Sequence, residues 1–396
     1  MTDRLYYQDS ALTAFDARIV RRVTTPDGRP GVILDRTAFY PTSGGQPFDT
    51  GILGGASVLE VLDQEDGDIL HVLDAPLADD AVHGVVDWAR RLDHMQQHTG
   101  QHLLSAAFDR VLGARTESFH LGTDASTIDL GQDVTADQAA AAEDEANRIV
   151  WSDRPVTIRF ADAAEAARLP LRKEPAREGT LRLIEIPDFD LSACGGTHVA
   201  RTGTIGIIAI AGIERFKGGS RVEFVCGGRA LRSHRHLGDL VARCVKALSV
   251  ASHEVPASIE RMQGDAKDLR RQMKDLQARL AGHEAEVLAA GADTTGTARV
   301  VVAALDGWDA PALKQIATTI AAKPGHVAIL IGLPAPSPLV IARSADVAFD
   351  AGAALKQLIA RFAGKGGGRA DLAQGGGLIG SPDDMVAFSR TLAGLG

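Results

Sequence analysis

Two short stretches of the sequence carry the side chains best suited to holding a metal ion. His98 and His102 are four residues apart, and Cys194 and His198 repeat this spacing later in the chain. The apolar residues within 103–112 recur at helical spacing, which places both histidines on one face of a helix, a turn apart. Three imidazoles and one thiolate form a set that binds Zn²⁺ tetrahedrally, so the sequence predicts one Zn²⁺ per chain.

Two glycines, Gly195 and Gly196, lie between the cysteine and the last histidine and allow the backbone to fold tightly around a metal. Four protein ligands are typical of structural zinc sites, whereas catalytic sites keep one position open. The pattern alone therefore leaves two alternatives: a structural zinc, or a catalytic zinc from which one ligand is displaced by substrate.

Four other side chains of the same types are expected to serve elsewhere. His94 and His120 are the nearest competing ligands, and we expect them in supporting or surface positions. Cys226 and Cys244 are expected to be packing residues, because a free cysteine usually behaves as a small apolar side chain.

The composition indicates a globular protein of two or three domains in a reducing compartment. The chain has 396 residues, of which 45% are hydrophobic and 23% charged. No apolar run reaches 18 residues and the N-terminus lacks a signal-peptide pattern, so we expect no membrane span and a cytoplasmic location. Three cysteines, an odd number, argue against a disulfide framework.

The distribution of charge matters more than the net charge of −9, which by itself does not favour nucleic-acid binding. Residues 201–250 contain nine basic side chains against three acidic ones. The basic residues are Arg201, Arg215, Lys217, Arg221, Arg229, Arg232, Arg235, Arg243 and Lys246. This local excess could meet a phosphate backbone, and the alternative is an ordinary solvated surface.

The fold class predicted for the whole chain is α+β, beginning with a small β-barrel over residues 1–90. Short strands are expected at 17–23, 31–34, 52–53, 57–63, 69–73 and 82–87, with turns between them. The glycine-containing segment 39–49 is expected to form a loop beside the barrel, with backbone N–H groups accessible at Gly44 and Gly45.

Residues 91–235 are predicted to form a second domain, which contains the metal site. Helices are expected at the histidine pair and at 136–150, and strands at 115–120, 126–130, 156–160, 181–186, 205–211 and beyond 217. In the strand at 115–120, Thr116 and Ser118 would point to the same side because side chains alternate along a strand.

The remainder of the chain is predicted to be a helical linker over 236–292 and an α/β domain over 293–396. A heptad seam runs from Ile259 to Val287 in alternating steps of three and four residues. The seam could pair with a second copy or with the helix expected at 232–250. The glycine-rich segment 364–377 is not a P-loop, because its Gly-Lys is not followed by Ser or Thr.

These motifs resemble those of alanyl-tRNA synthetase editing domains and the free-standing AlaX editing proteins, in their long form. The editing domain of threonyl-tRNA synthetase shares the histidine and cysteine pairs, but the segment 39–49 and the glycine-rich segment favour the alanyl branch. The last domain resembles the DHH-associated domain of alanyl-tRNA synthetase, in which the glycine-rich segment 364–377 would form a loop. The resemblance covers nearly the whole chain.

The resemblance implies roles for further residues. Gly44, Gly45, Gln46 and Arg221 are expected to stabilise charge on the carbonyl or ribose oxygens, and Thr116 or Ser118 to sense a hydroxyl on the amino acid. Contacts with tRNA are expected from Arg172, Lys173, Lys217, Lys365 and Arg369.

The function implied is hydrolysis of the ester in tRNA(Ala) mischarged with serine or, second, glycine. A pocket for alanine discriminates poorly against glycine or an added hydroxyl, so a second site must remove the errors. We expect no synthetase core, action in trans, and a possible homodimer. Three alternatives remain: an editor of Ser-tRNA(Thr), a zinc hydrolase of free esters or peptides, and a non-catalytic RNA-binding protein with structural zinc.

Overall fold

The computed structural model describes residues 1–172 and 180–395 of the chain. These residues form two compact units, Met1–Arg243 and Cys244–Gly396, each with its own core. The predicted segments 1–90 and 91–235 both fall in the first unit, and the predicted helical linker 236–292 is divided between the two. No helix among the described residues is both long and apolar enough to span a membrane.

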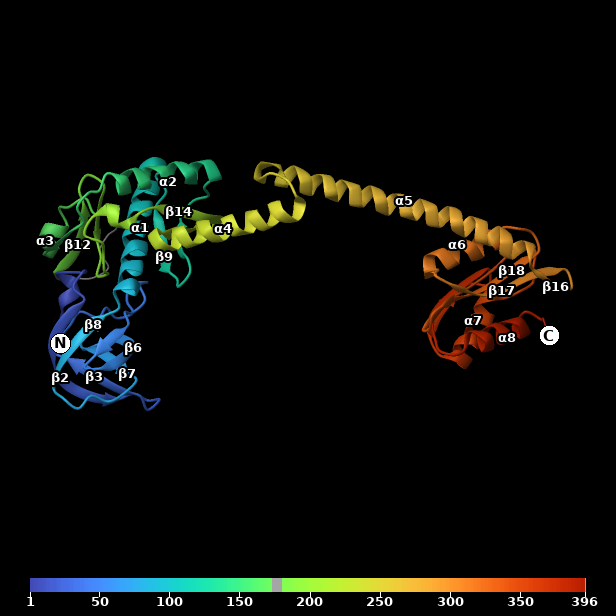
Figure 1. Ribbon diagram of the computed structural model, residues 1–396, viewed down its shortest axis with the longest axis horizontal. Helices are drawn as coiled ribbons and strands as arrows, with labels where there is room; N and C mark the ends of the chain where they lie inside the picture. Colours follow the sequence, from blue (N-terminus) through green and yellow to red (C-terminus); the bar gives the residue numbers. More distant parts are fainter. Residues whose placement is uncertain (173–179, 396) are drawn as a thin grey trace. The chain divides into compact units, whose positions relative to one another are not determined.

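The first unit begins with a closed six-stranded barrel, as the sequence predicted (Figure 1). In order around the barrel, its strands are β2 (Ala14–Thr24), β3 (Pro30–Leu34), β7 (Ile69–Leu73), β6 (Ala56–Asp63), β5 (Gly51–Leu53) and β8 (Ala81–Val86). Buried and exposed residues alternate along β8, which gives the barrel an apolar interior and a polar surface. Three short elements, β1 (Asp3–Arg4), the 3₁₀ helix η1 (Leu5–Tyr7) and β4 (Arg36–Thr37), were not predicted.

Helix α1 (Trp88–Leu112) leaves the barrel and carries two of the three histidines of the predicted metal site, His98 and His102. The side chain of Asp87 accepts hydrogen bonds from the first backbone N–H groups of α1, and Gly113 ends the helix with a positive φ of 66°. Arg91 connects the helix to the barrel side, because its buried guanidinium donates to Asp49 and to the carbonyl oxygens of Ser10 and Ala38.

Two sheets pack around α1 and complete the first unit. One has the order β14-β15-β10-β9 and the other β11-β12-β13. The strands are β9 (Thr116–Leu121), β10 (Ser126–Leu130), β11 (Thr157–Ala161), β12 (Leu181–Ile186), β13 (Asp190–Ala193), β14 (Ile208–Phe216) and β15 (Gly219–Cys226). The helical elements are α2 (Ala136–Trp151), α3 (Ala163–Ala166), η2 (Thr202–Ile205) and α4 (Gly227–Leu248), which contains the boundary between the units.

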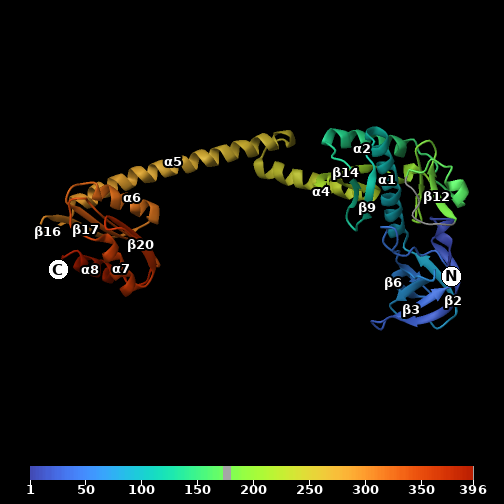
Figure 2. The same cartoon turned by 180° about the vertical axis from the view of Figure 1, so that it is seen from behind.

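The second unit is a six-stranded mixed sheet with helices on both faces (Figure 2). Its strands, in sheet order, are β16 (Asp293–Thr295), β17 (Ala298–Asp306), β18 (His326–Leu333), β19 (Ser337–Arg343), β21 (Leu372–Leu378) and β20 (Lys365–Gly368). Among the described strands of this sheet, only the pair β17–β18 is parallel. The helical elements are η3 (Ser252–Glu254), α5 (Val255–Ala290), α6 (Ala310–Ala321), α7 (Ala351–Phe362) and α8 (Pro382–Leu392).

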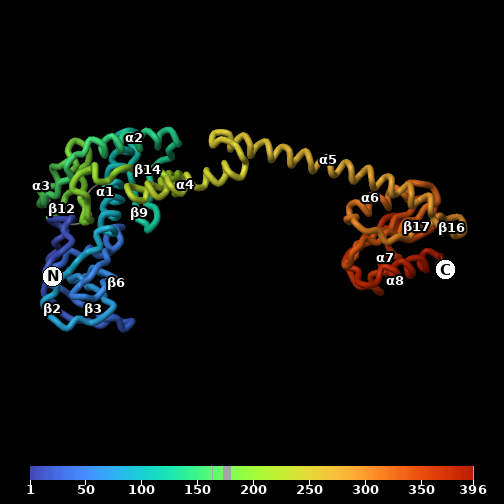
Figure 3. The backbone as a smooth tube through the Cα atoms, in the orientation of Figure 1, coloured from blue at the N-terminus to red at the C-terminus, as the bar shows by residue number. Residues whose placement is uncertain are grey.

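One feature of the second unit differs from the sequence prediction. The glycine-rich segment forms the antiparallel strands β20 and β21 instead of a loop, because small residues allow the two backbones to pair closely. The backbone trace in Figure 3 shows α5 as one continuous helix. Its alanines at 281, 285 and 289 are buried in the core with α6, whereas most residues of the predicted heptad seam are exposed.

Candidate active site

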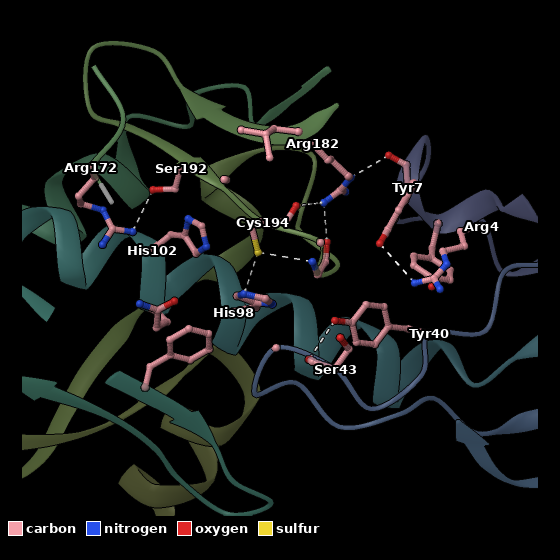
Figure 4. A pocket seen from close by; sticks show the side chains of 18 of the residues that line it. Arg4, Tyr7, Tyr40, Ser43, His98, His102, Arg172, Arg182, Ser192 and Cys194 are labelled. Atoms are coloured by element: carbon pink, nitrogen blue, oxygen red, sulfur yellow. Dashed lines mark hydrogen bonds between the residues drawn. The ribbon is translucent and has the colours of Figure 1, made fainter. Parts of the chain in front are cut away.

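One cavity of about 610 Å³ adjoins the predicted metal ligands, and Figure 4 shows part of its lining. Its walls come from the N-terminal segment, the loop after Phe39, helix α1, strand β9 and strands β12 and β13 with the cysteine loop. Lining side chains include Arg4, Tyr6, Tyr7, Tyr40, His98, Gln101, His102, Thr116, Ser118, Phe119, Arg172, Arg182 and Cys194.

The structure brings the four predicted metal ligands together. Candidate ligand atoms of His98, His102, Cys194 and His198 all lie within 4.8 Å of one another. The Cys194 Sγ atom is 3.3 Å from His98 Nε2 and 3.4 Å from His198 Nε2. A tetrahedral zinc with ordinary Zn–N and Zn–S bonds separates such ligand atoms by about 3.5 Å. The donor set and its spacing therefore fit this metal.

Each histidine of the cluster is oriented by a hydrogen bond at its Nδ1 atom. His98 Nδ1 lies 2.8 Å from Gln46 Oε1 and His102 Nδ1 lies 3.0 Å from a carboxylate oxygen of Asp190. His198 Nδ1 lies 3.2 Å from the hydroxyl of Thr99. With Nδ1–H donating to these oxygens, each Nε2 atom keeps its lone pair for a metal.

Without a metal, the charges in the cluster suit a Cys194 thiolate beside a neutral His198 and a protonated His102. Burial opposes ionisation of Cys194, but the His98 and His198 rings outweigh it, so the thiol pKa lies well below its usual value. Burial lowers the pKa of His198 to about 3. For His102 burial also lowers the pKa, but hydrogen bonds with Asp190 and Cys194 prevail and raise it to about 9.

Two glycines are required for this geometry. A Cβ atom at Gly196 would clash with the His98 ring, so any other residue would displace this ligand. A Cβ atom at Gly100 would clash with the Sγ atom of Cys226 where α1 packs on β15.

The remaining cysteines and the competing histidines lie outside the cluster. Cys226 is buried and serves in packing, as expected, and Cys244 is exposed. His94 is buried and His120 exposed, and neither is part of the cluster.

Gln46 has a different position from the expected one. It is fully buried and does not line the cavity. Its Oε1 atom accepts from His98 and from the backbone N–H of Thr197, and its Nε2 atom donates to the Thr197 hydroxyl. With both ends of the amide engaged, Gln46 orients His98 and does not face the cavity. Gly44 lines the cavity, whereas Gly45 packs against Phe119 behind it.

Arg221 also departs from expectation, because it lies outside the cavity lining. It faces Asp129 across the pairing of β15 with β10, and the two form a bidentate ion pair of 2.7 and 3.0 Å. Asp129 accepts a third hydrogen bond from Ser118, at 2.5 Å. Ser118 and Thr116 do line the cavity, and Thr116 donates to the hydroxyl of Ser105.

The residues expected to contact tRNA are dispersed over the structure. Arg172 lines the cavity and is paired with Asp190 at 2.6 Å. Lys217 is exposed in the turn between β14 and β15. Lys365 and Arg369 are exposed in the second unit, at β20 and directly after it. Lys173 lies outside the described residues.

Sequence reasoning missed several residues of the cavity and of the layer behind the ligands. Asp190 and Thr99 orient metal ligands, and Tyr7 and Arg182 line the cavity. The Arg182 guanidinium donates to the carbonyl oxygens of Cys194 and Gly196 and so supports the cysteine loop. No local pattern marks these residues, since their partners are distant in sequence.

Fold and site together define a class: a mixed α+β protein with a closed barrel and a buried cluster of three histidines and one cysteine beside a cavity. Residues 181–223 match the family model of the threonyl and alanyl tRNA synthetase second additional domain. Residues 297–392 match the DHHA1 domain.

Similarity over nearly the whole chain identifies the particular family. The chain is 30% identical over 388 residues to the alanyl-tRNA editing protein AlaX-L of Pyrococcus horikoshii, covering 95% of this chain and 94% of that protein. The chain belongs to the AlaX-L family of alanyl-tRNA editing proteins.

Alanine–tRNA ligases are similar over a part of their length. Those of Methanoregula boonei and Pyrococcus furiosus are 33% and 32% identical to the chain, which is covered to 95% and 94%. The chain spans 42% of the length of each ligase.

Proposed function

We propose that this protein is a trans-editing hydrolase that cleaves the ester between a wrong amino acid and tRNA(Ala), chiefly serine and secondarily glycine. The observation that carries the proposal is the metal-ligand cluster on the wall of a cavity lined by polar side chains. Membership of the AlaX-L family supports this reaction class. The corresponding place of action is the cytoplasm, where charged tRNA is used.

We propose Zn²⁺ as the ion, one per chain, held by His98, His102, Cys194 and His198. When bound, zinc would supply Lewis-acid stabilisation of the ester carbonyl or anchor the substrate's amino group. Gln46, Asp190 and Thr99 place oxygens at the three Nδ1 atoms. They thereby keep each imidazole protonated at Nδ1, with Nε2 free to bind the metal.

Discrimination between serine and alanine is proposed to reside in the wall formed by α1 and β9. Thr116 and Ser118 line this wall, and their hydroxyl protons are already donated to Ser105 and Asp129. Their oxygens therefore keep lone pairs that can accept from a serine hydroxyl. Alanine offers no such donor, so the wall favours the hydroxylated substrate.

The test is deacylation of Ser-, Gly- and Ala-tRNA(Ala) and of Ser-tRNA(Thr) by the wild type and by Cys194→Ala. Rapid loss of Ser-tRNA(Ala), with Ala-tRNA(Ala) spared, is expected for the wild type. Cys194→Ala should be inactive, and Cys244→Ala, which removes an exposed cysteine, should behave as the wild type. Preference for Ser-tRNA(Thr) would redirect the assignment to the threonyl branch.

A second candidate, non-catalytic RNA binding with a structural zinc, is favoured by the closed set of four protein ligands. It predicts tRNA binding without turnover, and zinc removal that unfolds the first unit instead of only silencing it. Inertness towards all four aminoacyl-tRNAs with zinc still bound would support this candidate.

We propose further that Lys217, Lys365 and Arg369 contact the tRNA backbone and that the protein is a homodimer. Exposed cationic side chains are available at all three positions. For the dimer, the support is an exposed apolar stripe on α5 at heptad spacing.

A further inference from the structure

Two hydrogen-bond donors in the cavity wall have no acceptor among the described residues, although Arg4 interacts with the oxygen of the second. They are the Nη2 group of Arg182 and the hydroxyl of Tyr6. Both side chains line the cavity, and they are 6% and 0% exposed. Buried polar groups in folded proteins are nearly always hydrogen-bonded, so two unsatisfied donors in one cavity wall are suited to binding a ligand.

The geometry of Arg182 shows where this ligand lies. Its Nε atom donates to the backbone oxygen of Tyr7 at 2.9 Å. Its Nη1 atom donates to the backbone oxygens of Cys194 and Gly196 at 2.7 and 2.9 Å. Because a guanidinium is planar and rigid, the remaining corner, Nη2, faces the space between the Tyr7 segment and the cysteine loop. Figure 4 shows Arg182 between these two segments.

Arg182 also differs from Arg4 and Arg172, the other arginines that line the cavity, in having no carboxylate partner among the described residues. Arg4 is paired with Asp63 at 2.6 Å and Arg172 with Asp190 at 2.6 Å. Among the described residues, no carboxylate lies within 4.0 Å of Arg182. Burial lowers the pKa of Arg182 and the negative charge of Cys194 opposes this, so an anion at Nη2 would stabilise the guanidinium further.

The Tyr6 hydroxyl can donate a hydrogen bond and therefore requires a hydrogen-bond acceptor as its partner. Burial raises the pKa of Tyr6 above its usual range, so its hydroxyl remains protonated and able to donate. Tyr6 packs edge-on against Tyr7 and Tyr40, with ring centroids 5.1 and 5.2 Å away. Two donors without a competing acceptor are the chemistry of an oxyanion site.

We propose that Arg182 and Tyr6 form a subsite for the phosphate of the terminal nucleotide of the RNA substrate. This inference rests on the proposed function: the ester hangs on the ribose 2′ or 3′ oxygen, and the 5′-phosphate of that nucleotide lies across the same ribose. With the ester carbonyl at the metal cluster, Arg182 beside the cysteine loop is in reach of this phosphate. Arginine is well suited to bind phosphate oxygens.

The first test is equilibrium binding of 5′-AMP and adenosine to the full-length protein by calorimetry. The wild type should bind 5′-AMP about 10- to 100-fold more tightly than adenosine, as expected for hydrogen bonds to a charged group. Arg182→Gln should abolish this preference and Tyr6→Phe, which preserves the buried ring, should reduce it several-fold. Arg110→Gln is the matched control, because Arg110 also donates to a carbonyl oxygen, that of Phe189, but does not line the cavity.

The second test compares hydrolysis of two small esters, 2′(3′)-O-seryl-5′-AMP and 2′(3′)-O-seryl-adenosine. The ratio of their kcat/KM values should favour the phosphorylated ester in the wild type and approach one in Arg182→Gln. A merely structural arginine, or one acting on the ester carbonyl, would lower both rates equally and leave the ratio unchanged.

The two tests separate the subsite from the proposed function. A retained preference for 5′-AMP with no hydrolysis of either ester would refute the proposed function and leave the subsite standing. Hydrolysis of both esters at equal rates, with equal binding of 5′-AMP and adenosine, would overturn the subsite. If Arg182→Gln fails to fold, the Tyr6→Phe variant decides. A preference for 5′-AMP over adenosine that is as large in Tyr6→Phe as in the wild type would count against the proposal.

Discussion

At the scale of single residues, the metal cluster depends on the groups behind it as much as on the ligands. A neutral imidazole binds a metal through one nitrogen only when the other nitrogen carries the proton. Gln46, Asp190 and Thr99 provide oxygens at the three Nδ1 atoms, each from a segment distant from its histidine. The spacing of ligands alone therefore does not determine metal affinity.

Replacement of Gln46 tests this orientation directly. Gln46→Met keeps the side-chain volume but removes the acceptor for His98 Nδ1–H, so zinc affinity should fall about 10- to 100-fold. Competition with a chromophoric chelator measures the change. Gln97→Met is the matched control, because Gln97 is equally buried on α1 but bonds to the backbone of Cys226. Equal affinity in Gln46→Met and the wild type would refute the orienting role.

His71 makes the stability of the first unit depend on pH. It is fully buried in the barrel, where burial lowers its pKa to about 4 from 6.5, and it contacts the Thr37 hydroxyl. A histidine with a depressed pKa contributes stability above pH 6.5 that is lost as the pH falls towards 4. The loss should be about 1.4 kcal/mol per pH unit, or about 3 kcal/mol in all.

The measurement is urea unfolding of the wild type and His71→Gln at several values between pH 7 and pH 4. Glutamine retains a hydrogen-bonding group but does not titrate. The wild type should lose about 2–3 kcal/mol more unfolding free energy than the variant over this range. Parallel pH profiles for the two proteins would show that His71 is not the source.

At the scale of elements, the packing of α1 on β15 holds the histidine face towards the cysteine loop. Gly100 permits this contact, because α1 approaches the Sγ atom of Cys226 too closely for any Cβ atom. Gly100→Ala should therefore destabilise the first unit by about 1–3 kcal/mol, the usual range for overpacking. Urea unfolding provides the free energy, and zinc content reports whether the ligands remain in place.

A double-mutant cycle identifies the clash as the cause. In the Cys226→Ala background, the added methyl group at position 100 would have only ordinary contacts, 3.5 Å or more from its neighbours. Gly100→Ala should then cost much less than it does with cysteine present. An equal cost in both backgrounds would instead indicate a backbone effect within α1.

The barrel strands and the four ligands could be predicted because their signals are local. Strand alternation, turn residues and four-residue spacings are all visible within short windows. The supporting contacts are not local: His102 and Asp190 are 88 residues apart, and Gln46 and His98 are 52 apart. For the same reason Arg221 was misplaced, since its partner Asp129 becomes its neighbour only when β10 pairs with β15.

At the scale of the whole molecule, the second unit carries an exposed apolar stripe along helix α5. Helix α5 in the second unit is about 54 Å long, from 36 residues at 1.5 Å each. Seven of its apolar residues at seam positions are 42–64% exposed. They are Ile259, Met262, Leu269, Met273, Leu276, Leu280 and Val287. A continuous stripe of this kind usually marks an interface, and its heptad spacing fits a second copy of the same helix.

Charged substitutions in the stripe test the proposed homodimer. Leu269→Lys combined with Leu276→Lys should shift the protein from dimer to monomer in sedimentation equilibrium, because buried lysines would disrupt the seam. The fold should persist, since both side chains are exposed within the chain. Ile379→Lys is the control, because this residue is 70% exposed in the same unit but lies outside α5. A wild type that sediments at 41.7 kDa at high concentration would remove the dimer and leave the stripe for a different partner.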